Sequence, residues 1–447
     1  MDDNKYGNKL IKSVEENNII DESLFLKYNV KRGLRNSDSS GVLVGLTKIS
    51  SVIGYEKLDE DVVPVEGKLF YRGIDIKELI EGFQKEKRQG YEEIVFLLLF
   101  GRLPSKEELS NIKEHLIMLR DLPTNFNEDV ILKFKGKDMM NMLARAVLVL
   151  YTLDENADNV STENLIKQSL SLIAKFPIIL VNSYNAMVYG YHKKTLMIRH
   201  PRDDLNTAEN FLYMLKGDNY TQLEADILDL VLVLHAEHGG GNNSSFSVRV
   251  VSSSDTDTYS AIAAGLGSLK GPLHGGANKQ VTMMIEDIKK NVKNWKDDDE
   301  VAEYLRRILD KKAHDKSGKI YGLGHAVYTK SDPRAVILKE KASQLAKEQG
   351  RTDEFELYEA IERLGPRLFQ DMKGNKKIIS ANVDFYSGFV YECLGIPVEL
   401  YTPLFAMARI SGWCAHRIEE MLISKRIIRP AYKSVAELQK YISLDER

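Results

Sequence analysis

Apolar residues along most of this chain recur at the spacing of an amphipathic α-helix, and this periodicity limits the possible folds more than any other feature. After Thr221, the residues Ile227, Leu230, Val231 and Leu234 keep the i, i+3, i+4, i+7 pattern. Three such segments begin with a capping-box pair: Ser105 with Glu108, Asn206 with Glu209, and Thr221 with Glu224. Strand-like segments are few and short, chiefly residues 42–44 and 68–71. We therefore expect an all-α fold.

The distribution of charge predicts two helical domains of unequal size. A charged stretch at 286–319 follows a glycine-rich break, and the chain becomes apolar again near residue 390. A length of 447 residues favours two to three domains. We expect a large domain built from 1–278 and 391–447, and a smaller, mobile helical domain at 279–390.

Composition indicates which partners the protein can bind and where in the cell it is found. The net charge of −3 provides no basic surface for nucleic acid. Cys393 and Cys414 are too far apart for a CxxC pair and read as reduced core thiols. No apolar run approaches the ~20 residues that span a bilayer, and the N-terminus has no apolar signal region. We expect a cytoplasmic protein that binds neither nucleic acid nor membrane.

Two histidine-bearing breaks stand out within the helical pattern. Residues 234–242 read Leu-His-Ala-Glu-His-Gly-Gly-Gly-Asn, which places His235 and His238 at a helix C-terminus before three glycines. Residues 271–278 read Gly-Pro-Leu-His-Gly-Gly-Ala-Asn, which holds His274 between two helices. Glycines let a ligand approach the backbone closely. Capping or turn histidines are the structural alternative, but the flanking glycines favour a ligand site.

A third break and two further charged residues complete the candidate site. Gly-Leu-Gly-His325 precedes Asp332-Pro333-Arg334, where Asp332 is a natural N-cap and Arg334 lies in a first helical turn suited to an anion. Asp384 lies among aromatic residues, so partial desolvation would raise its basicity, although it could also be a helix cap. Arg409 lies on an apolar helix and needs an anion, either an internal carboxylate or a ligand. Arginines with histidines and a desolvated aspartate indicate proton abstraction next to the carbonyl of a substrate with several carboxylates.

These motifs resemble those of the citrate synthase family. The resemblance is carried by 271–278, 322–334, 382–388 and 208–216, in order and at the family spacing, and extends to Gly-Lys-Leu-Phe-Tyr-Arg-Gly-Ile at 67–74 and Ile-Ile-Arg-Pro at 427–430. It covers about residues 40–435. It implies an all-α homodimer with a small domain that closes over substrate, acting in the tricarboxylic acid cycle. The implied reaction condenses oxaloacetate with acetyl-CoA and water to citrate and CoA.

The resemblance also implies a role for each matching residue. Asp384 would remove a methyl proton from the thioester, His274 would stabilise the enol, and His325 would protonate the oxaloacetate carbonyl. The oxaloacetate-binding residues would be His238, Asn242, Arg334, Phe405, Arg409 and, from the partner subunit, Arg429. The CoA-binding residues would be Ile320, Tyr321, Gly322, Leu323, Gly324, Lys330 and Asn382. No metal or cofactor is implied, since acetyl-CoA is a substrate.

The sequence departs from the family in the CoA loop and leaves three further functions open. Tyr321 stands where proline is common, and Thr329 stands where many relatives have a basic residue that Lys330 could replace. The first ~40 residues do not match the β-rich extension of some hexameric members, which favours a dimer. A 2-methylcitrate synthase using propionyl-CoA fits the same motifs, because one methylene changes binding by only about 1–3 kcal/mol. The second open function is a metal hydrolase using His235, Glu237 and His238, and the third is a non-catalytic helical scaffold.

Overall fold

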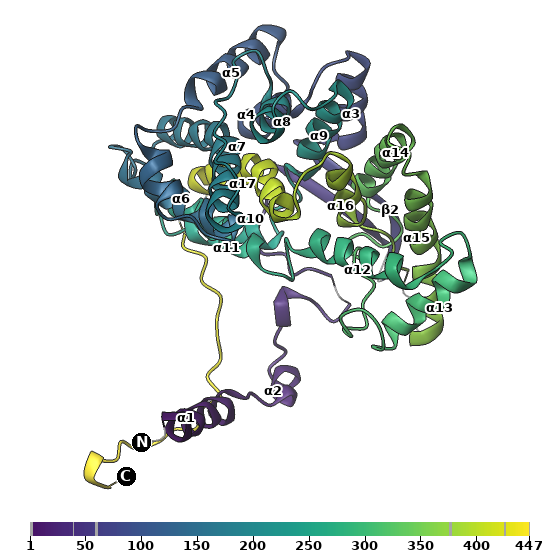
Figure 1. The fold of residues 1–447 in the computed structure, drawn as a ribbon. Helices are drawn as coiled ribbons and strands as arrows, with labels where there is room; N and C mark the ends of the chain where they lie inside the picture. The colour runs from purple at the N-terminus through teal and green to yellow at the C-terminus, as the bar shows by residue number, and fades with distance from the viewer. Residues whose placement is uncertain (1–2, 39, 59–60, 375–377, 424–425, 447) are drawn as a thin grey trace. The chain divides into compact units, whose positions relative to one another are not determined.

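The computed structural model describes residues 3–38, 40–58, 61–374, 378–423 and 426–446 (Figure 1). The chain divides into two compact units, Met1–Leu46 and Thr47–Arg447. The first unit contains helices α1 (Asp3–Asn18) and α2 (Glu22–Lys27) and a short 3₁₀ turn, η1 (Arg32–Leu34). The candidate site residues all belong to the second unit.

The second unit is built almost entirely from helices, which confirms the expected fold class. They are α3 (Ile76–Lys85), α4 (Tyr91–Phe100), α5 (Lys106–Leu119), η2 (Asn127–Leu132), α6 (Met139–Thr152), α7 (Thr162–His192), α8 (Thr207–Lys216), α9 (Gln222–His235), α10 (Asn243–Ser252), α11 (Thr258–Lys270), α12 (Ala277–Asn291), α13 (Asp298–Leu309), α14 (Pro333–Glu348), α15 (Thr352–Lys373), α16 (Val383–Cys393), η3 (Val398–Leu400), α17 (Tyr401–Ile423) and η4 (Leu444–Glu446). Capping boxes begin α5, α8 and α9, as their sequences predict.

A small antiparallel sheet accompanies the helices. Its strands β1 (Ser50–Leu58), β2 (Asp61–Tyr71) and β3 (Ile74–Asp75) lie in chain order, with Ser50 opposite Tyr71. The strand expected at 68–71 is therefore confirmed, as the end of a longer strand. The strand expected at 42–44 is wrong: the described pairing nearest to it is a single bridge between Arg35 and Gly41. Leu43 and Val44 are exposed, so no neighbouring strand or core surface among the described residues rewards an extended pairing there.

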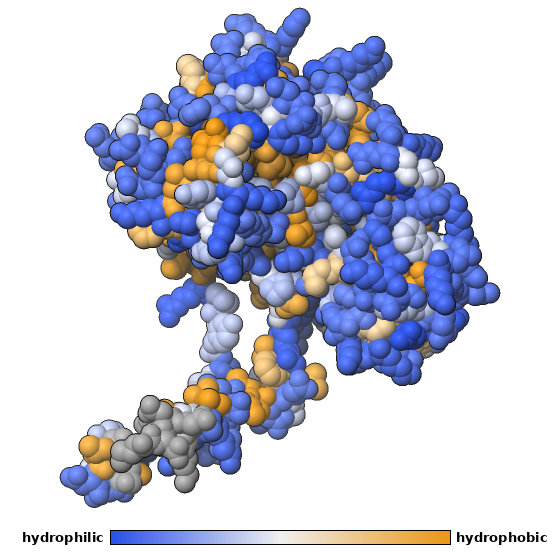
Figure 2. Space-filling view, viewed as in Figure 1, coloured by the Kyte–Doolittle hydropathy of each residue, from blue (hydrophilic) through white to orange (hydrophobic). Residues whose placement is uncertain are grey.

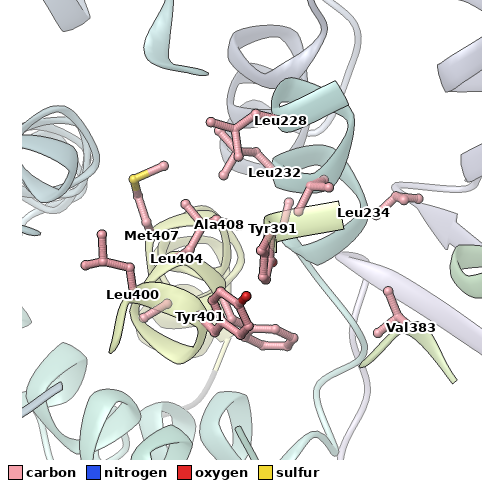
Figure 3. Packing of buried hydrophobic residues seen from close by; sticks show 14 of the residues in the cluster. Leu228, Leu232, Leu234, Val383, Tyr391, Leu400, Tyr401, Leu404, Met407 and Ala408 are labelled. Carbon is pink, nitrogen blue, oxygen red and sulfur yellow. The ribbon is translucent and has the colours of Figure 1, made fainter. Parts of the chain in front are cut away.

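Helix α17 forms the centre of the core and is buried along most of its length. It packs against α4, α7, α9, α10 and α11. In Figure 3, Leu404 and Ala408 of α17 face Leu228 and Leu232 of α9, with Tyr391 of α16 beside them. Because α17 and α9 are tightly packed, polar residues on their facing sides are fixed in position.

Helix α7 is the one described helix that is long and apolar enough to cross a membrane by length and composition. Its apolar window is 78% buried inside the molecule. Packing against α5, α6, α8 and α17 therefore accounts for its composition.

Helices α12 to α16 gather on one side of the second unit (Figure 1). Within this group α13 packs on α15, and both α12 and α14 pack on α16. The group corresponds to the residues expected to form a small domain at 279–390. The division into a large domain (1–278 with 391–447) and a mobile small domain stays a prediction.

Candidate active site

The end of α9 and the turn after it place two buried histidines. His235 is the last residue of α9 and is fully buried, and His238 is 7% exposed. Within the described chain, both ring nitrogens of His235 and Nε2 of His238 have no hydrogen-bond partner. Burial, together with the positive charges of Arg334 and Arg409, holds the pKa of both imidazoles well below the usual range. Both rings are therefore neutral at physiological pH.

Arg409 on α17 is a buried cation whose guanidinium is only partly used. Its Nε donates a hydrogen bond to the carbonyl oxygen of His235 at 2.7 Å, and its Nη1 and Nη2 have no partner among the described residues. Burial lowers its pKa to about 10, so it remains charged. The ring of Phe405 lies 4.7 Å from Cζ, and its centroid is 4.5 Å from that of His235. A buried charge with two unused donors is costly, which indicates an anionic ligand.

Arg334 in the first turn of α14 is held by the residue that caps the same helix. Its Nε and Nη2 donate to the two oxygens of Asp332 at 3.0 and 2.7 Å. Asp332 also accepts from the backbone N–H of Arg334 at 3.0 Å and from that of Val383 at 3.3 Å. Burial works against the charge of Arg334, but Asp332 outweighs it and raises the pKa. Asp332 thus fixes the arginine and joins the starts of α14 and α16.

The loop that carries His325 depends on two glycines in the left-handed region. Gly322 and Gly324 have φ of +81° and +92°, and a Cβ on Gly322 would lie 2.7 Å from Cδ2 of Phe385. Hydrogen bonds tie this loop to the start of α16: Gly324 N to Ser380 O at 2.8 Å, Asn382 N to Gly322 O at 2.9 Å, and Asn382 Nδ2 to Gly324 O at 2.9 Å. The loop therefore sets His325 and Asp384 in a fixed relation.

The ring of His325 is oriented by the backbone and by aromatic neighbours. Its Nδ1 accepts hydrogen bonds from the N–H groups of Val327 and Tyr328 at 3.0 and 3.1 Å, so the ring hydrogen lies on Nε2. Tyr328 stacks on the ring with centroids 4.8 Å apart. The ring of His238 meets it edge-on at 5.1 Å. The structure thus brings together histidines that are 87 positions apart in the sequence.

Asp384 is the second residue of α16 and is not its cap. Asn382 takes that role, since its Oδ1 accepts from the N–H of Asp384 at 3.0 Å. Burial raises the pKa of Asp384 to about 6, against the lowering effect of Arg334 and Arg409. The carboxyl is therefore a stronger base than an exposed aspartate, as its aromatic surroundings predict.

His274 is held by a serine that the sequence did not single out. Nε2 of His274 lies 3.0 Å from Oγ of Ser244 and 3.3 Å from the backbone N–H of Ser244, which donates to it. Trp413 Nε1 donates to the same hydroxyl at 3.0 Å. Because Nε2 accepts from a backbone N–H, the ring hydrogen lies on Nδ1. Burial and the charge of Arg409 lower the pKa of His274 to about 4, so the imidazole is a neutral donor.

The remaining residues predicted to bind oxaloacetate divide into two groups. Asn242 caps α10 and accepts from Ser244 Oγ at 3.0 Å, close to His274. Arg429 is exposed and follows the end of α17 in the chain. Its role as a residue of the partner subunit's site stays a prediction.

The loop predicted to bind CoA is ordered around Tyr321. The hydroxyl of Tyr321 donates to Asp315 at 2.5 Å, and Leu323 bridges to Ala381. Ile320 is buried, whereas Lys330 is exposed and able to meet a phosphate. The CoA assignments stay predictions.

One group of described acidic residues has its oxygens close enough to hold a metal ion: Glu286, Glu354 and Glu392. All three carboxylates already have a cationic partner: Lys289 pairs with Glu286 at 2.6 Å, and Arg351 pairs with Glu354 at 2.6 Å and Glu392 at 2.8 Å. The cluster therefore works as an ion-pair network joining α12, α15 and α16.

A zinc hydrolase would require His235, Glu237 and His238 to converge. Glu237 instead directs Oε1 at Ser50, Gly239 and His416. The three side chains do not form a metal-binding group among the described residues. The arrangement fits a set of hydrogen-bond donors around a small anion better than a metal centre.

Three residues that support the site were not predicted from the sequence. Ser244 and Tyr328 hold His274 and His325, and the hydroxyl of Tyr71 bonds the backbone of Val233 and Glu237 at 3.0 Å each. Ser244 lies two residues after Asn242, at the end of the glycine-rich segment, which was the available signal. Tyr71 lies in the 67–74 segment that carries the resemblance, but nothing local indicates its contacts, because its partners are more than 160 positions away.

The chain is similar in sequence and in structure to known citrate synthases. Residues 38–431 match the family described as citrate synthase, C-terminal domain. Citrate synthase 2 of Bacillus subtilis is 35% identical, covering 91% of this chain and 98% of its own. The citrate synthase of Deinococcus radiodurans is 36% identical, covering 94% and 99%. A citrate synthase of Thermoplasma acidophilum, solved in a ternary complex with carboxymethyl coenzyme A and oxaloacetate, superposes with a TM-score of 0.75 at 28% identity, covering 94% of this chain and 99% of that one.

Proposed function

Because this chain belongs to the citrate synthase family, we propose that it condenses oxaloacetate with acetyl-CoA and water to give citrate and CoA. The observation that carries the proposal is the buried Arg409. Its Nη1 and Nη2 have no partner among the described residues, and its charge acts on the neutral His235 and His238 and on Asp384. Such a site accepts an anionic substrate and a base-catalysed proton transfer. The T. acidophilum relative, solved with oxaloacetate and a CoA derivative, supports the same substrate classes.

Enolisation of the thioester would use Asp384 and His274. The carboxylate of Asp384 removes a proton from the methyl carbon, and its pKa of about 6 makes it a better base than an exposed aspartate. The Nδ1–H of His274 donates to the thioester oxygen as the enol forms. Because a thioester methyl is very weakly acidic, base and donor must act together in a preorganised site.

Condensation would use the second pair of histidines and the arginines. The enol carbon attacks the carbonyl of oxaloacetate, and the Nε2–H of His325 donates to the oxygen on which charge develops. His238, Asn242, Phe405 and Arg409 hold the substrate. Nη1 and Nη2 of Arg409, which have no partner in the described part of the chain, bind a carboxylate. Arg334 binds a second carboxylate through the donors that Asp332 leaves unused. Water then hydrolyses citryl-CoA.

We place Arg429 in the site of a second subunit of a homodimer. Exposed apolar side chains support an interface: Leu148 of α6 and Tyr189 and Tyr191 of α7 are 45–49% exposed, and an apolar area is visible on the face that carries α7 (Figure 2). Association would bury these residues and bring Arg429 to the partner's oxaloacetate. A cytoplasmic location belongs to the same proposal.

The test is the release of free thiol from acetyl-CoA and from propionyl-CoA, each with and without oxaloacetate. We expect release with acetyl-CoA that depends strictly on oxaloacetate. A higher kcat/KM for propionyl-CoA would assign the chain as a 2-methylcitrate synthase instead. Release without oxaloacetate, or none with either thioester, would contradict the proposal.

A further inference from the structure

A buried hydrogen-bonded chain lies directly behind the turn that carries His238. Glu237 is fully buried, and its Oε1 accepts from Ser50 Oγ at 2.9 Å, from Gly239 N at 2.6 Å and from His416 Nε2 at 2.8 Å. The other nitrogen of His416, Nδ1, faces Arg249, whose Nε lies 3.1 Å away and whose Nη2 lies 2.7 Å away. Arg249 continues the chain to Glu420 at 2.9 Å and also pairs with Glu419.

The chemistry of these groups fixes the protonation state of His416. A guanidinium can only donate, so Nδ1 of His416 accepts from Arg249. The ring hydrogen then lies on Nε2 and is donated to Glu237. His416 is thus a neutral imidazole that transmits the orientation of Arg249 to the carboxylate of Glu237. Burial would raise the pKa of Glu237, whereas the hydrogen bonds from His416 and Ser50 and the charge of Arg409 lower it.

Helix α17 holds the segment 235–239 at two points one heptad apart. Arg409 donates to the carbonyl of His235, and His416 donates to the side chain of Glu237. Strand β1 adds a third point, since Ser50 Oγ also accepts from Gly239 N at 3.1 Å. His238 stands between these anchors, and its Nε2 is left without a partner among the described residues. The anchors keep an unsatisfied imidazole aimed in one direction, which is the state needed to receive a ligand.

We propose that His416 and Glu237 are positioning residues for oxaloacetate: the chain from Arg249 through His416 to Glu237 sets the place of His238 without touching substrate. This inference depends on the proposed function for its substrate. It predicts a larger effect on oxaloacetate than on acetyl-CoA, because His238 binds oxaloacetate in the proposed function.

The test compares two substitutions of His416 in the full-length enzyme. His416→Gln keeps a donor for Glu237 and an acceptor for Arg249, as the neutral imidazole does, whereas His416→Leu removes both. We expect His416→Leu to raise the KM for oxaloacetate by about tenfold or more and to leave the KM for acetyl-CoA within about twofold. The Gln variant should stay within about threefold of the wild type for both substrates.

The neighbouring Arg417 offers a matched control for general destabilisation. It is equally buried on α17, but it bonds Thr258 at 3.0 Å, Ser252 at 3.1 Å and the carbonyl of Thr256 at 2.6 Å. Arg417→Met should lower Tm without changing the KM for oxaloacetate. If His416→Leu lowers Tm as Arg417→Met does while keeping the wild-type KM, His416 is merely structural and the inference is wrong.

A milder variant keeps the inference testable if His416→Leu does not fold. Ser50→Ala removes only one hydroxyl, which donates to Glu237 and accepts from Gly239. It should raise the KM for oxaloacetate by about threefold to fivefold, and an unchanged KM would overturn the inference. Absence of oxaloacetate-dependent thiol release in the wild type would instead contradict the proposed function, so the two failures are distinguishable.

Discussion

The Nε of Arg409 lies 2.7 Å from the carbonyl oxygen of His235, and this bond joins the central helix α17 to the end of α9. It spends one donor of a fully buried guanidinium and leaves Nη1 and Nη2 without partners in the described chain. Within the part of the chain that the structure describes, the positive charge of Arg409 is therefore neutralised only when an anionic ligand binds. Stability and binding should respond in opposite directions when it is removed.

Arg409→Met should leave the ligand-free protein equally stable or more stable. Among the described residues this buried charge has no carboxylate partner, so an apolar chain of similar volume removes a desolvation penalty. The same substitution should weaken oxaloacetate binding by about 30-fold or more, because a buried charge-assisted contact is worth about 2–5 kcal/mol. Thermal unfolding with and without oxaloacetate checks both effects. A large loss of ligand-free Tm would show that Arg409 is mainly structural.

The pKa of Asp384 predicts a specific dependence of stability on pH. The folded value of about 6 lies above the ordinary value of 3.8, so the folded state binds this proton more tightly than the unfolded state does. Its favourable contribution is complete below pH 3.8 and is lost as pH rises through 6. Asp384→Asn should therefore stabilise the protein by about 3 kcal/mol at pH 8 and by little at pH 4. Equal stabilisation at both pH values in urea unfolding would contradict the raised pKa.

Ionisation of Asp384 should also shape the activity profile. The base is effective only when deprotonated, so kcat/KM should fall about tenfold for each pH unit below about 6. Thiol release measured from pH 5 to 9 gives this limb directly. A flat profile down to pH 5 would mean that the essential base has an ordinary carboxyl pKa.

Trp413 contacts Ser244, which in turn contacts His274, so a change at Trp413 should lower the reaction rate without any direct contact with His274. Trp413→Phe removes the N–H that orients the hydroxyl of Ser244 and keeps most of the buried ring. We expect kcat to fall by about fivefold, which corresponds to one hydrogen bond of about 1 kcal/mol, with a small change in KM for oxaloacetate. An unchanged kcat would show that His274 does not need this support.

Substitution of Gly322 by alanine should lower the stability of the protein more than the same substitution at Gly350. Gly322→Ala meets both a φ of +81° and a Cβ placed 2.7 Å from Phe385, whereas Gly350→Ala meets a φ of +65° with open space around it. The control should cost about 1 kcal/mol and Gly322→Ala about 2–4 kcal/mol. Denaturant unfolding separates the two. Equal costs would mean that the loop before His325 moves away without loss.

The sequence predicted the helices and the histidine-bearing breaks because both are local. Capping boxes, the cap at Asp332 and the glycines around His325 act within a few residues, and the structure has them where the pattern indicated. The possible cap at Asp384 is wrong, since the neighbouring Asn382 takes that role. The β1–β2 hairpin was mostly missed, since its pairing depends on a register between segments. The supports of the site were missed for the same reason: Ser50, Tyr71 and His416 act on Glu237 across at least 160 positions.

The central claim is that Asp384 removes a carbon-bound proton in a site that already holds oxaloacetate. The most direct measurement is thiol release by Asp384→Asn beside its thermal stabilisation by oxaloacetate. We predict that stabilisation by oxaloacetate persists while kcat falls by about 1,000-fold or more, as expected for loss of a general base. Thiol release near the wild-type rate in this variant would contradict the account.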